Sequence, residues 1–437
     1  MTRTISRIAV IGAGTMGAGI AGVCAKAGLP VVLLDLQPGA AAAAIERLTG
    51  GSRPVLSDEE AARITPGNLN DDLALVSDAD WLCEVIVEKT GPKRELFRTL
   101  DKVRKPGSIL SSNTSGIPLR DISADMPEAV RRDIAITHFF NPVHLMKLVE
   151  LVPGEETAPD VIPTLAAFIQ NHLGKGPVYA KDTINFIGNR IGCFWLLAGL
   201  HEALPYLQQG LSIEKADALL GEPVGLPATG FFGLHDLIGL DIMESIANNL
   251  KAGLPEGDAG LPYATFPPAV QAMFEAGQLG RKTGAGFYKL ERHADGSKQM
   301  MVFNPLTASW AEAAAVSLSA TEQDFASLVQ DKSTSGEFVR AMMLPTLAYA
   351  ADLVPQIADD IVNVDRAMRW GFNWQKGPFE LIDVLGAGTF AELCQAASKP
   401  VPSMVSKLLA AGADSFYKDA GRRYFGVDSE WHDVPQA

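Results

Sequence analysis

Short apolar runs alternate with longer amphipathic stretches in the first part of the chain. The runs within "RIAVIGAG", "PVVLLDL", "DADWLCEVIVEK", "GSILSSNTSG" and "RDIAITHFFNP" read as strands separated by helical or turn segments. This alternation predicts an α/β Rossmann-type domain over residues 1–185, with a parallel, doubly wound sheet. Ligands of such sheets bind at the carboxyl ends of the strands, where we expect Glu88, Ser115 and His138.

Beyond residue 185 the pattern becomes helical, and two long segments look alike. One begins "NRIGCFWLLAGLHEALPYL" and the other "VRAMMLPTLAYAADLVPQI". Corresponding residues at a nearly constant separation are Arg190 and Arg340, Asp217 and Asp365, Gly230 and Gly377, and Asp236 and Asp383. The repetition predicts all-α tandem-repeat domains, the first over residues 186–292 and the second over 335–437. Between them, residues 293–334 are polar and then irregular, and are expected to be a linker.

A glycine-rich turn joins the first predicted strand to an alanine-rich helix. Gly12, Gly14 and Gly17 stand in GxGxxG spacing within "RIAVIGAGTMGAGIAGVCAKAG". In this context the first glycine permits a tight turn, the second lets the backbone approach a pyrophosphate, and the third lets helix and strand pack closely. The pyrophosphate then faces the free N–H groups of the helix N-terminus. The sequence therefore predicts a dinucleotide site.

An aspartate at the end of the next strand indicates which dinucleotide binds. Asp35 ends "PVVLLDL", about 20 positions after the first glycine, as expected of a carboxylate that bonds a ribose 2′-hydroxyl. The same carboxylate would repel a 2′-phosphate. NAD is therefore the expected cofactor rather than NADP.

The mostly apolar stretch "AITHFFNPVHLMKLVELV" carries a histidine and a glutamate where buried strands are expected. In "KLVELV" the period of two places Glu150 on the same face as Leu148 and Val152. A buried carboxylate needs a cationic or hydrogen-bonding partner, and His138 on the preceding strand is the nearest candidate. A carboxylate on one imidazole nitrogen fixes the tautomer and leaves the other nitrogen free to take a proton.

Beside a dinucleotide, such a pair suits the oxidation of an alcohol. The base removes the hydroxyl proton while hydride leaves the same carbon for the nicotinamide. Two other histidines, His144 and His172, show no comparable pairing and are expected to be structural.

Composition and charge limit the classes of protein to which this chain can belong. At 437 residues the chain should form two or three units, and its 47% hydrophobic and 20% charged residues indicate a folded protein throughout. The net charge of −14 argues against a nucleic-acid partner or an anionic membrane surface. No membrane span, secretory signal or metal site is expected, and the four scattered cysteines suggest reduced core residues in a cytoplasmic protein.

Several strings together resemble the L-3-hydroxyacyl-CoA dehydrogenases of fatty-acid β-oxidation. They are "GAGTMGAGIA", "SSNTS", "THFFNPVHLMKLVELV", "NFIGNR" and "GRKTGAGFYKL". The resemblance implies oxidation of an (S)-3-hydroxyacyl-CoA to the 3-ketoacyl-CoA, with His138 as catalytic base and Glu150 as its orienting carboxylate. It also implies that Ser115 and Asn189 hydrogen-bond the substrate around its 3-oxygen. The implied cofactor-binding residues are Gly12, Gly14, Thr15, Met16, Gly17, Asp35, Glu88, Lys93, Asn141 and Lys282.

One position departs from the family pattern, in which a Pro-Gly pair commonly precedes the phenylalanine of "NFIGNR". This chain has Ile184 and Asn185 there. Asparagine tolerates the left-handed backbone that glycine would allow, so we expect the interdomain turn to be kept.

The resemblance also implies how the helical half is used. Single-copy relatives are homodimers that bury an apolar face of the helical domain, and a covalent second copy can cover that face within one chain. We therefore expect an internal pseudo-dimer, whose second copy is structural because Val339 replaces Asn189.

The chain looks most like the dehydrogenase part of bacterial bifunctional proteins, but no hydratase sequence follows, so hydratase activity is not expected. An enoyl-CoA hydratase or thiolase is a possible partner, and the CoA 3′-phosphate contact is guessed to lie between Arg47 and Arg63.

Two alternative functions stay open from the sequence. One is a β-hydroxyacid dehydrogenase acting on a free acid, but the lysine base of that family would fall on Asn185. The other is a silent NAD-binding module or a scaffold for other β-oxidation enzymes, which the complete set of Ser115, His138, Glu150 and Asn189 disfavours.

Overall fold

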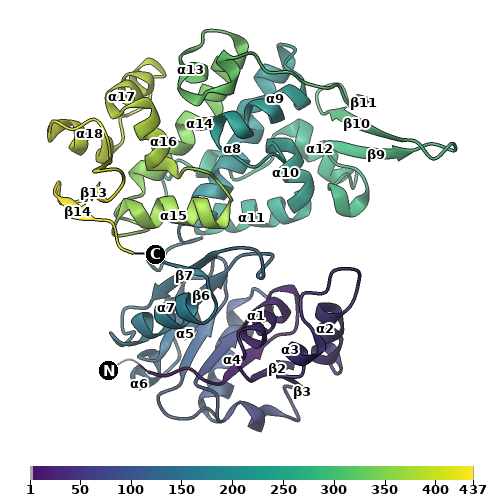
Figure 1. Cartoon of the computed structure of the whole chain (residues 1–437), viewed down its shortest axis with the longest axis vertical. Coiled ribbons are helices and arrows are strands. Elements are labelled where there is room, and N and C mark those ends of the chain that lie inside the picture. Colours follow the sequence, from purple (N-terminus) through teal and green to yellow (C-terminus); the bar gives the residue numbers. More distant parts are fainter. Residues whose placement is uncertain (1–2, 437) are drawn as a thin grey trace. The chain divides into compact units, whose positions relative to one another are not determined.

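The structure is a computed structural model that describes residues 3–436, and these residues form two compact units (Figure 1). The sheet unit contains the chain up to Ile187, together with residues 356–359 and the residues described after Val434. The helical unit contains residues 188–355 and 360–434.

The sheet unit is built on one eight-stranded sheet with the strand order β3-β2-β1-β4-β5-β6-β7-β8. The strands are β1 (Ile8–Ile11), β2 (Val31–Asp35), β3 (Ile64–Asn68), β4 (Trp81–Glu84), β5 (Ile109–Ser112), β6 (Ile134–Phe139), β7 (Leu148–Pro153) and β8 (Gly176–Tyr179). Strands β1, β4, β5 and β6 are buried along their whole length, which explains their nearly uninterrupted apolar sequences.

The sheet is mixed rather than wholly parallel. The expected parallel pairing is confirmed for β1 to β6, whereas β7 runs antiparallel to β6 and β8 runs parallel to β7. The connection explains the difference, because only residues 140–147 join β6 to β7, and a parallel neighbour would need a crossover of about a dozen residues or more.

Among the described residues, seven α-helices accompany this sheet. They are α1 (Thr15–Lys26), α2 (Ala40–Thr49), α3 (Asp58–Ala61), α4 (Thr90–Asp101), α5 (Leu119–Ser123), α6 (Glu128–Arg131) and α7 (Val161–Asn171). Apolar residues of α1, α2 and α7 form one buried cluster with the sheet, including Ile20, Ala44 and Leu165. Burial of these helix faces holds the loops at the carboxyl ends of the strands on a rigid support.

The helical unit contains eleven α-helices among its described residues. They are α8 (Gly188–Gln208), α9 (Ile213–Leu219), α10 (Phe231–Ile238), α11 (Leu240–Gly253), α12 (Pro268–Glu275), α13 (Phe325–Gln330), α14 (Thr334–Asp352), α15 (Ile361–Gly371), α16 (Pro378–Leu385), α17 (Ala387–Ala396) and α18 (Ser403–Ala410). The long helices α8 and α14 pack against each other. Gly192 of α8 lies so close to the Phe372 ring that an added Cβ would be 2.0 Å from it, so the ring fills the space a side chain would occupy.

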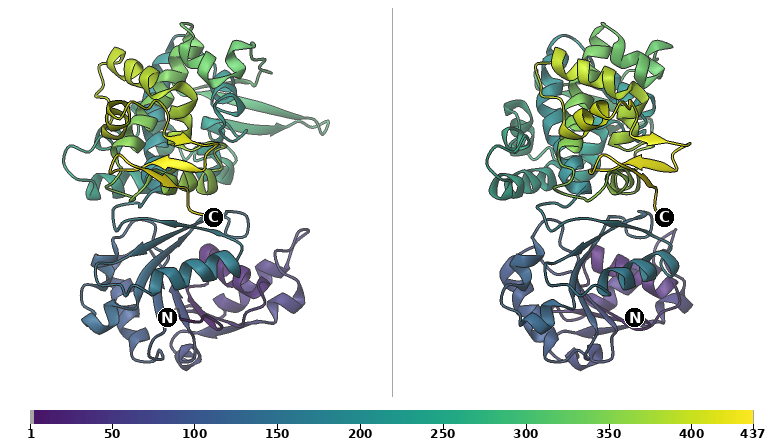
Figure 2. Two further views of the ribbon diagram at one scale, coloured as in Figure 1. Left: turned by 60° about the vertical axis from the view of Figure 1, so that its left-hand side comes forward. Right: turned by 90° about the vertical axis from the view of Figure 1, so that its left-hand side faces the viewer.

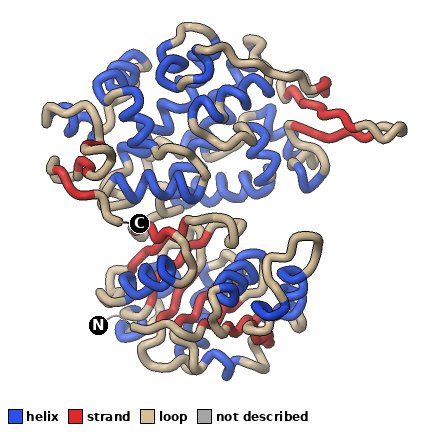
Figure 3. Tube along the Cα trace, in the orientation of Figure 1, coloured by secondary structure: helices blue, strands red, loops and turns tan. Residues whose placement is uncertain are grey.

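Two small antiparallel sheets complete the helical unit. One consists of β9 (Tyr288–Arg292), β10 (Lys298–Asn304) and β11 (Ser309–Glu312), and the other of β12 (Tyr417–Lys418), β13 (Arg423–Phe425) and β14 (Trp431–Asp433). Figure 3 shows β9 and β10 as a hairpin that projects from the helices, and Figure 2 shows the second sheet in yellow. The segment 293–334, expected as a linker, thus contains β10, β11 and α13. Its strands are hard to recognise because the apolar residues of β10 are consecutive, from Met300 to Phe303, and do not alternate with polar ones.

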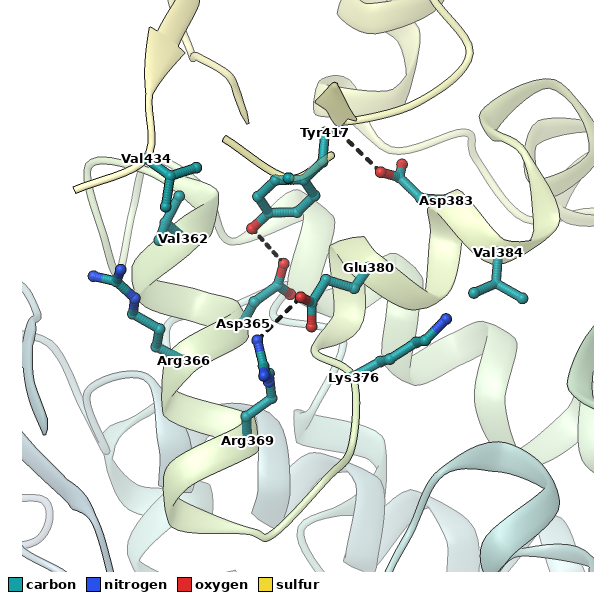
Figure 4. Close-up of a pocket in the computed structure, with 11 residues that line it drawn as sticks. Val362, Asp365, Arg366, Arg369, Lys376, Glu380, Asp383, Val384, Tyr417 and Val434 are labelled. Atoms are coloured by element: carbon teal, nitrogen blue, oxygen red, sulfur yellow. Dashed lines mark hydrogen bonds and ion pairs between the residues drawn. The ribbon is translucent and has the colours of Figure 1, made fainter. Parts of the chain in front are cut away.

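The same arrangement of two aspartates and a tyrosine occurs twice in the helical unit. Tyr288 donates its hydroxyl to Asp217 (2.8 Å) and its backbone N–H to Asp236 (2.7 Å). Tyr417 donates its hydroxyl to Asp365 (2.6 Å) and its backbone N–H to Asp383 (2.9 Å), as Figure 4 shows. Each tyrosine therefore ties a strand that follows the helices to two helical carboxylates.

The structure bears on three further expectations. Among residues 3–436, no helix is both long and apolar enough to cross a bilayer. The four cysteines are buried and unpaired. Within the same described range, no group of three or more His, Cys, Asp and Glu side chains could hold a metal ion.

Candidate active site

The glycine-rich loop between β1 and α1 has the geometry that a dinucleotide needs. Gly12 has φ +113°, and an added Cβ would lie 2.4 Å from the Val85 carbonyl oxygen. At Gly17 an added Cβ would lie 1.7 Å from the Gly12 carbonyl oxygen, so only glycine lets the helix approach its loop here. Gly14 has no such neighbour within 4 Å and leaves space where a pyrophosphate could approach the backbone.

The N-terminus of α1 is available to an anion. Its N-cap, Gly14, has no side chain to cap the helix, and no acidic residue stands in the first turn. Thr15 is exposed and Met16 is partly exposed at this end. Free N–H groups and the positive end of the helix dipole therefore face outward, which fits the phosphates of the predicted cofactor.

Asp35, at the end of β2, is fixed beside this loop. Its carboxylate accepts hydrogen bonds from the backbone N–H groups of Ala13 (2.6 Å) and Gln37 (2.9 Å). Arg47 of α2 donates to the Ala13 carbonyl oxygen (3.1 Å). Asp35 thus holds the glycine-rich loop in addition to presenting negative charge at the strand end.

His138 and Glu150 lie directly opposite each other on the antiparallel strands β6 and β7. The imidazole Nδ1 is 2.7 Å from Glu150 Oε2. The other carboxylate oxygen, Oε1, accepts the backbone N–H of Ile187 (3.0 Å). Both side chains are buried, with 3% of His138 and 0% of Glu150 exposed, so the pairing expected from strand alternation is present in the structure.

Ser115 completes a chain of hydrogen bonds through the imidazole. Its Oγ is 3.1 Å from His138 Nε2. Because the carboxylate accepts the Nδ1 proton, Nε2 is the unprotonated nitrogen of the neutral ring and accepts from the serine hydroxyl. The rings of Phe140 and Phe186 flank the imidazole at 4.6 and 5.7 Å between centroids and limit the access of water to it.

Glu88 positions the serine loop. Its Oε1 accepts the backbone N–H of Ser115 (2.9 Å) and the Thr114 hydroxyl (2.5 Å). Burial raises the pKa of Glu88, but the charge of Lys93 and the bonds from Thr114 and Ser115 outweigh it and leave the pKa below its usual value. An ionised Glu88 thus holds the residue that contacts the imidazole.

Lys93 lies between two carboxylates. Its ammonium is 2.7 Å from Glu84 Oε1 and 3.1 Å from Glu88 Oε2, and its side chain is 1% exposed. Glu84 also accepts from the Ile86 N–H (2.8 Å) and the Ser112 hydroxyl (2.5 Å). Glu84 was not expected from the sequence; the available signal was a carboxylate in the buried run "DWLCE" with a lysine nine positions later.

The remaining predicted site residues are distributed over both units. Asn141 is exposed after β6 and precedes Pro142 through a cis peptide bond. Asn185 has φ +61°, which confirms that asparagine adopts the left-handed backbone at this turn. Asn189 is the second residue of α8, and Lys282 pairs with Asp241 (2.6 Å); both belong to the helical unit.

Comparison with family models matches most of the chain. The model described as "3-hydroxyacyl-CoA dehydrogenase, NAD binding domain" matches residues 7–183. The model described as "3-hydroxyacyl-CoA dehydrogenase, C-terminal domain" matches residues 186–290 and again residues 336–412. The NAD binding domain confirms the expected cofactor class.

Similar proteins come from several bacteria. A "Probable 3-hydroxyacyl-CoA dehydrogenase" of Bacillus subtilis is 35% identical over 100% of this chain and 58% of its own length. A "Putative fatty acid oxidation complex trifunctional enzyme" of Rickettsia felis is 36% identical over 88% of this chain and 54% of its own length. The chain thus spans a little more than half of these relatives.

A solved structure supports the same assignment. The 3-hydroxybutyryl-CoA dehydrogenase of Escherichia coli K12 has a TM-score of 0.71 and 26% identity, and the match covers 94% of this chain and all of that one. The two matched domains, the relatives and the shared fold agree with one another: the chain belongs to the 3-hydroxyacyl-CoA dehydrogenase family.

Proposed function

We propose that this protein catalyses the NAD-dependent oxidation of an (S)-3-hydroxyacyl-CoA to the 3-ketoacyl-CoA. The observation that carries the proposal is the hydrogen-bonded series Ser115, His138 and Glu150. It lies in the sheet unit, which also carries the glycine-rich loop for NAD.

In this mechanism His138 is the general base. Glu150 holds the Nδ1 proton, so Nε2 presents its lone pair toward the Ser115 hydroxyl. The substrate 3-hydroxyl gives its proton to Nε2, and the carboxylate of Glu150 stabilises the imidazolium that forms. NAD, held by the glycine-rich loop, would supply the acceptor for the hydride that leaves the same carbon.

Ser115 and Asn189 are proposed to hold the 3-oxygen. Ser115 already lies at hydrogen-bonding distance from the base, and Glu88 fixes its backbone. Glu150 fixes the Ile187 N–H, two residues before Asn189 in the chain. The orienting carboxylate is thus tied to the peptide that leads into α8.

The residues of the glycine-rich loop would hold NAD. Gly14, Thr15 and Met16 would face the phosphates, and Asp35 the adenosine ribose. Glu88, Lys93, Asn141 and Lys282 are proposed as further cofactor-side residues. Because Lys93 is enclosed by two carboxylates, we propose that it acts by fixing Glu88 rather than by reaching the cofactor itself.

The helical half is proposed to be an internal pseudo-dimer formed by tandem duplication. The second match of the C-terminal domain model and the repeated tyrosine–aspartate contacts support this proposal. A buried contact also links the two copies: Arg190 of α8 donates to Tyr349 of α14 (2.5 Å) and pairs with Asp258. The second copy has Val339 in place of Asn189, so we assign it a structural role.

We propose that the reaction belongs to fatty-acid β-oxidation in the cytoplasm. The names of similar proteins, which include a "Putative fatty acid oxidation complex trifunctional enzyme", support this role. An enoyl-CoA hydratase would supply the 3-hydroxyacyl-CoA and a thiolase would consume the product, so either is a candidate partner.

A substrate comparison tests the proposal. The purified protein is assayed with acetoacetyl-CoA and with free acetoacetate, each with NADH and with NADPH. Turnover of the CoA ester with NADH is expected to exceed the other three rates at least tenfold. Preference for the free acid would favour the β-hydroxyacid dehydrogenase alternative, and absence of turnover with both substrates would favour a silent NAD-binding module.

A further inference from the structure

One cavity of the sheet unit is lined by basic side chains without a single acidic one. It has a volume of 710 Å³, and its basic and imidazole lining residues are Lys26, Arg53, His144, His172 and Lys175. By contrast, the cavity around Asp365 in the helical unit is lined by three basic and three acidic side chains (Figure 4). In a chain of net charge −14, an all-basic lining is unusual and favours a negatively charged ligand.

Lys175 contributes a buried ammonium group to the lining of this cavity. Its side chain is buried, with 7% exposed, and the ammonium donates to the backbone carbonyl oxygens of Val143 and Met146 (2.6 Å to Met146). No carboxylate of the described residues forms an ion pair with it. Burial lowers the pKa of Lys175, as expected of a buried cation that has only carbonyl partners. A buried charge without a counter-ion is costly, and an anion in the cavity would offset that cost.

Two further basic side chains and two imidazoles line the cavity with this buried ammonium, and they come from four separate segments. Lys26 is the last residue of α1, Arg53 lies between α2 and α3, His144 follows β6, and His172 follows α7. All four are exposed, and the His172 ring stacks on Phe168 with 5.4 Å between centroids. Glu60 of α3 interacts with the charge of Lys26 but does not line the cavity, and its carboxylate accepts the Ser57 backbone N–H.

The cavity is distinct from the dinucleotide site. The pyrophosphate is expected at the N-terminus of α1, whereas Lys26 stands at the C-terminus of this 12-residue helix. The two ends are about 16 Å apart at the rise of an α-helix. The negative end of the helix dipole does not favour an anion there, so the binding would depend on the side-chain cations.

We propose that this cavity binds a small molecule carrying a multiply charged phosphate group. Its volume is in the range of small-ligand sites, and the apolar residues Val23, Val55 and Leu173 in its lining could contact the uncharged part of such a molecule. The sources of this chemistry are a free phosphate compound and the phosphorylated end of a coenzyme A ester. The inference does not depend on the proposed dehydrogenase activity.

The test is calorimetric titration of inorganic pyrophosphate into the full chain saturated with NADH, which keeps the dinucleotide site filled. Lys175 is a poor target because its ammonium holds two carbonyls, so the exposed cations are changed in a Lys26→Ala/Arg53→Ala double variant. Arg7→Ala is the matched control, since Arg7 is a cation of the same unit paired with Asp78 outside the cavity. Dissociation constants are measured at constant low salt.

The double variant is expected to bind pyrophosphate at least tenfold more weakly than the wild type, and Arg7→Ala to bind it as well as the wild type does. A second titration with pyrophosphate in the presence of coenzyme A separates the two sources: competition identifies the coenzyme, and its absence identifies a free phosphate compound. Lack of pyrophosphate binding by the wild type, or equal binding by wild type and double variant, would overturn the proposal. Turnover of acetoacetyl-CoA by the wild type is measured separately and tests the dehydrogenase assignment, so a failure of either proposal can be told from a failure of the other.

Discussion

His138 on β6 and Glu150 on β7 are cross-strand partners whose side chains meet at 2.7 Å between Nδ1 and Oε2. The antiparallel register places both Cβ atoms on the same face of the sheet, so the pair does not depend on a flexible loop. The Ile187 N–H donates a hydrogen bond to the other carboxylate oxygen of Glu150, and this bond prevents the carboxyl group from rotating away from His138.

Replacing Glu150 by glutamine tests whether the carboxylate sets the tautomer of His138. When the glutamine oxygen accepts the hydrogen bond from the Ile187 N–H, the glutamine NH2 group donates to His138 Nδ1. This favours the tautomer in which Nε2 carries the proton. We expect kcat to fall by about 10²- to 10⁴-fold, the usual size of a general-base contribution. Steady-state kinetics should show an unchanged KM for NADH. Glu156→Gln, which alters a carboxylate paired with Arg131 in the same unit, should keep wild-type kcat; an active Glu150→Gln enzyme would contradict the assigned role.

Replacing Asp35 by asparagine tests the basis of the NAD preference. The asparagine oxygen can still accept one backbone N–H, whereas the charge that would repel a 2′-phosphate is gone. The ratio of kcat/KM for NADH to that for NADPH should fall about tenfold or more, the scale of a charge pair a few ångströms apart. The control Asp160→Asn removes a carboxylate that pairs with Arg3 in the same unit and should leave the ratio unchanged. The same ratio in Asp35→Asn and wild type would show that Asp35 holds the glycine-rich loop but does not select between NADH and NADPH.

Replacing Lys93 by methionine tests the buried charge network. The change leaves Glu84 buried without its cation and releases Glu88 from one of its partners. The free energy of unfolding should drop by ~3–5 kcal/mol, as when one partner of a buried ion pair is removed. Urea unfolding of the sheet unit measures this loss. Adding Glu84→Gln should restore part of the stability, because the uncompensated charge is then gone; a further loss of the same size would show that the two residues do not act together.

Replacing Tyr288 by phenylalanine tests the buried tyrosine–aspartate contact. Burial raises the pKa of Asp217 to about 7, although hydrogen bonds from Phe232, Tyr288 and Gly233 act to lower it. An unfolded aspartate titrates near ~3.9. Between about pH 4 and 7 the folded chain thus holds a proton that the unfolded chain has lost, so this group makes stability fall as pH rises through that window.

Loss of the Tyr288 hydroxyl removes a donor that favours the ionised carboxylate. Tyr288→Phe should therefore cost more above pH 7, about 1–2 kcal/mol, than at pH 4, where Asp217 is protonated in the folded state. Thermal unfolding at pH 4, 6 and 8 measures the difference. Tyr417→Phe is the counterpart in the second copy and should behave alike, because burial also raises the pKa of Asp365. A loss that is the same at every pH would show that the hydroxyl does not act through the charge of Asp217.

Local rules were enough to predict much of this site. The spacing of Gly12, Gly14 and Gly17 reflects steric demands of a single turn, and the pairing of His138 with Glu150 follows from the period of two on neighbouring strands. The direction of β7 was missed because the apolar pattern of a strand does not contain its direction. The direction of β7 depends on the length of its connection to β6, residues 140–147. The ends of that connection are known only from the register of the two strands.

Other features depend on contacts between distant segments and could not be predicted. In the sequence, Glu84 looks like an isolated acid at a strand end and Lys93 like a surface lysine. Their burial becomes apparent only when Lys93 of α4 pairs with Glu84 of β4. Lys175 stands in the glycine-rich stretch "LGKGP", whose pattern does not reveal that its side chain turns inward. The apolar residues of β10 are consecutive and those of β11 are Trp310 and Ala311, so neither strand shows the alternation of apolar and polar residues that indicates a half-buried strand.

The most direct test of the proposed chemistry is a comparison of wild type and His138→Ala. Stopped-flow reduction of acetoacetyl-CoA by NADH gives the rate of the chemical step, and a fluorescence titration of NADH gives the affinity for the cofactor. We expect the rate to fall by at least 10³-fold while the dissociation constant for NADH stays within about twofold, because the imidazole bonds Ser115 and Glu150 and lies outside the glycine-rich loop. A variant that still reduces the substrate at close to the wild-type rate would contradict the assignment of His138 as the base.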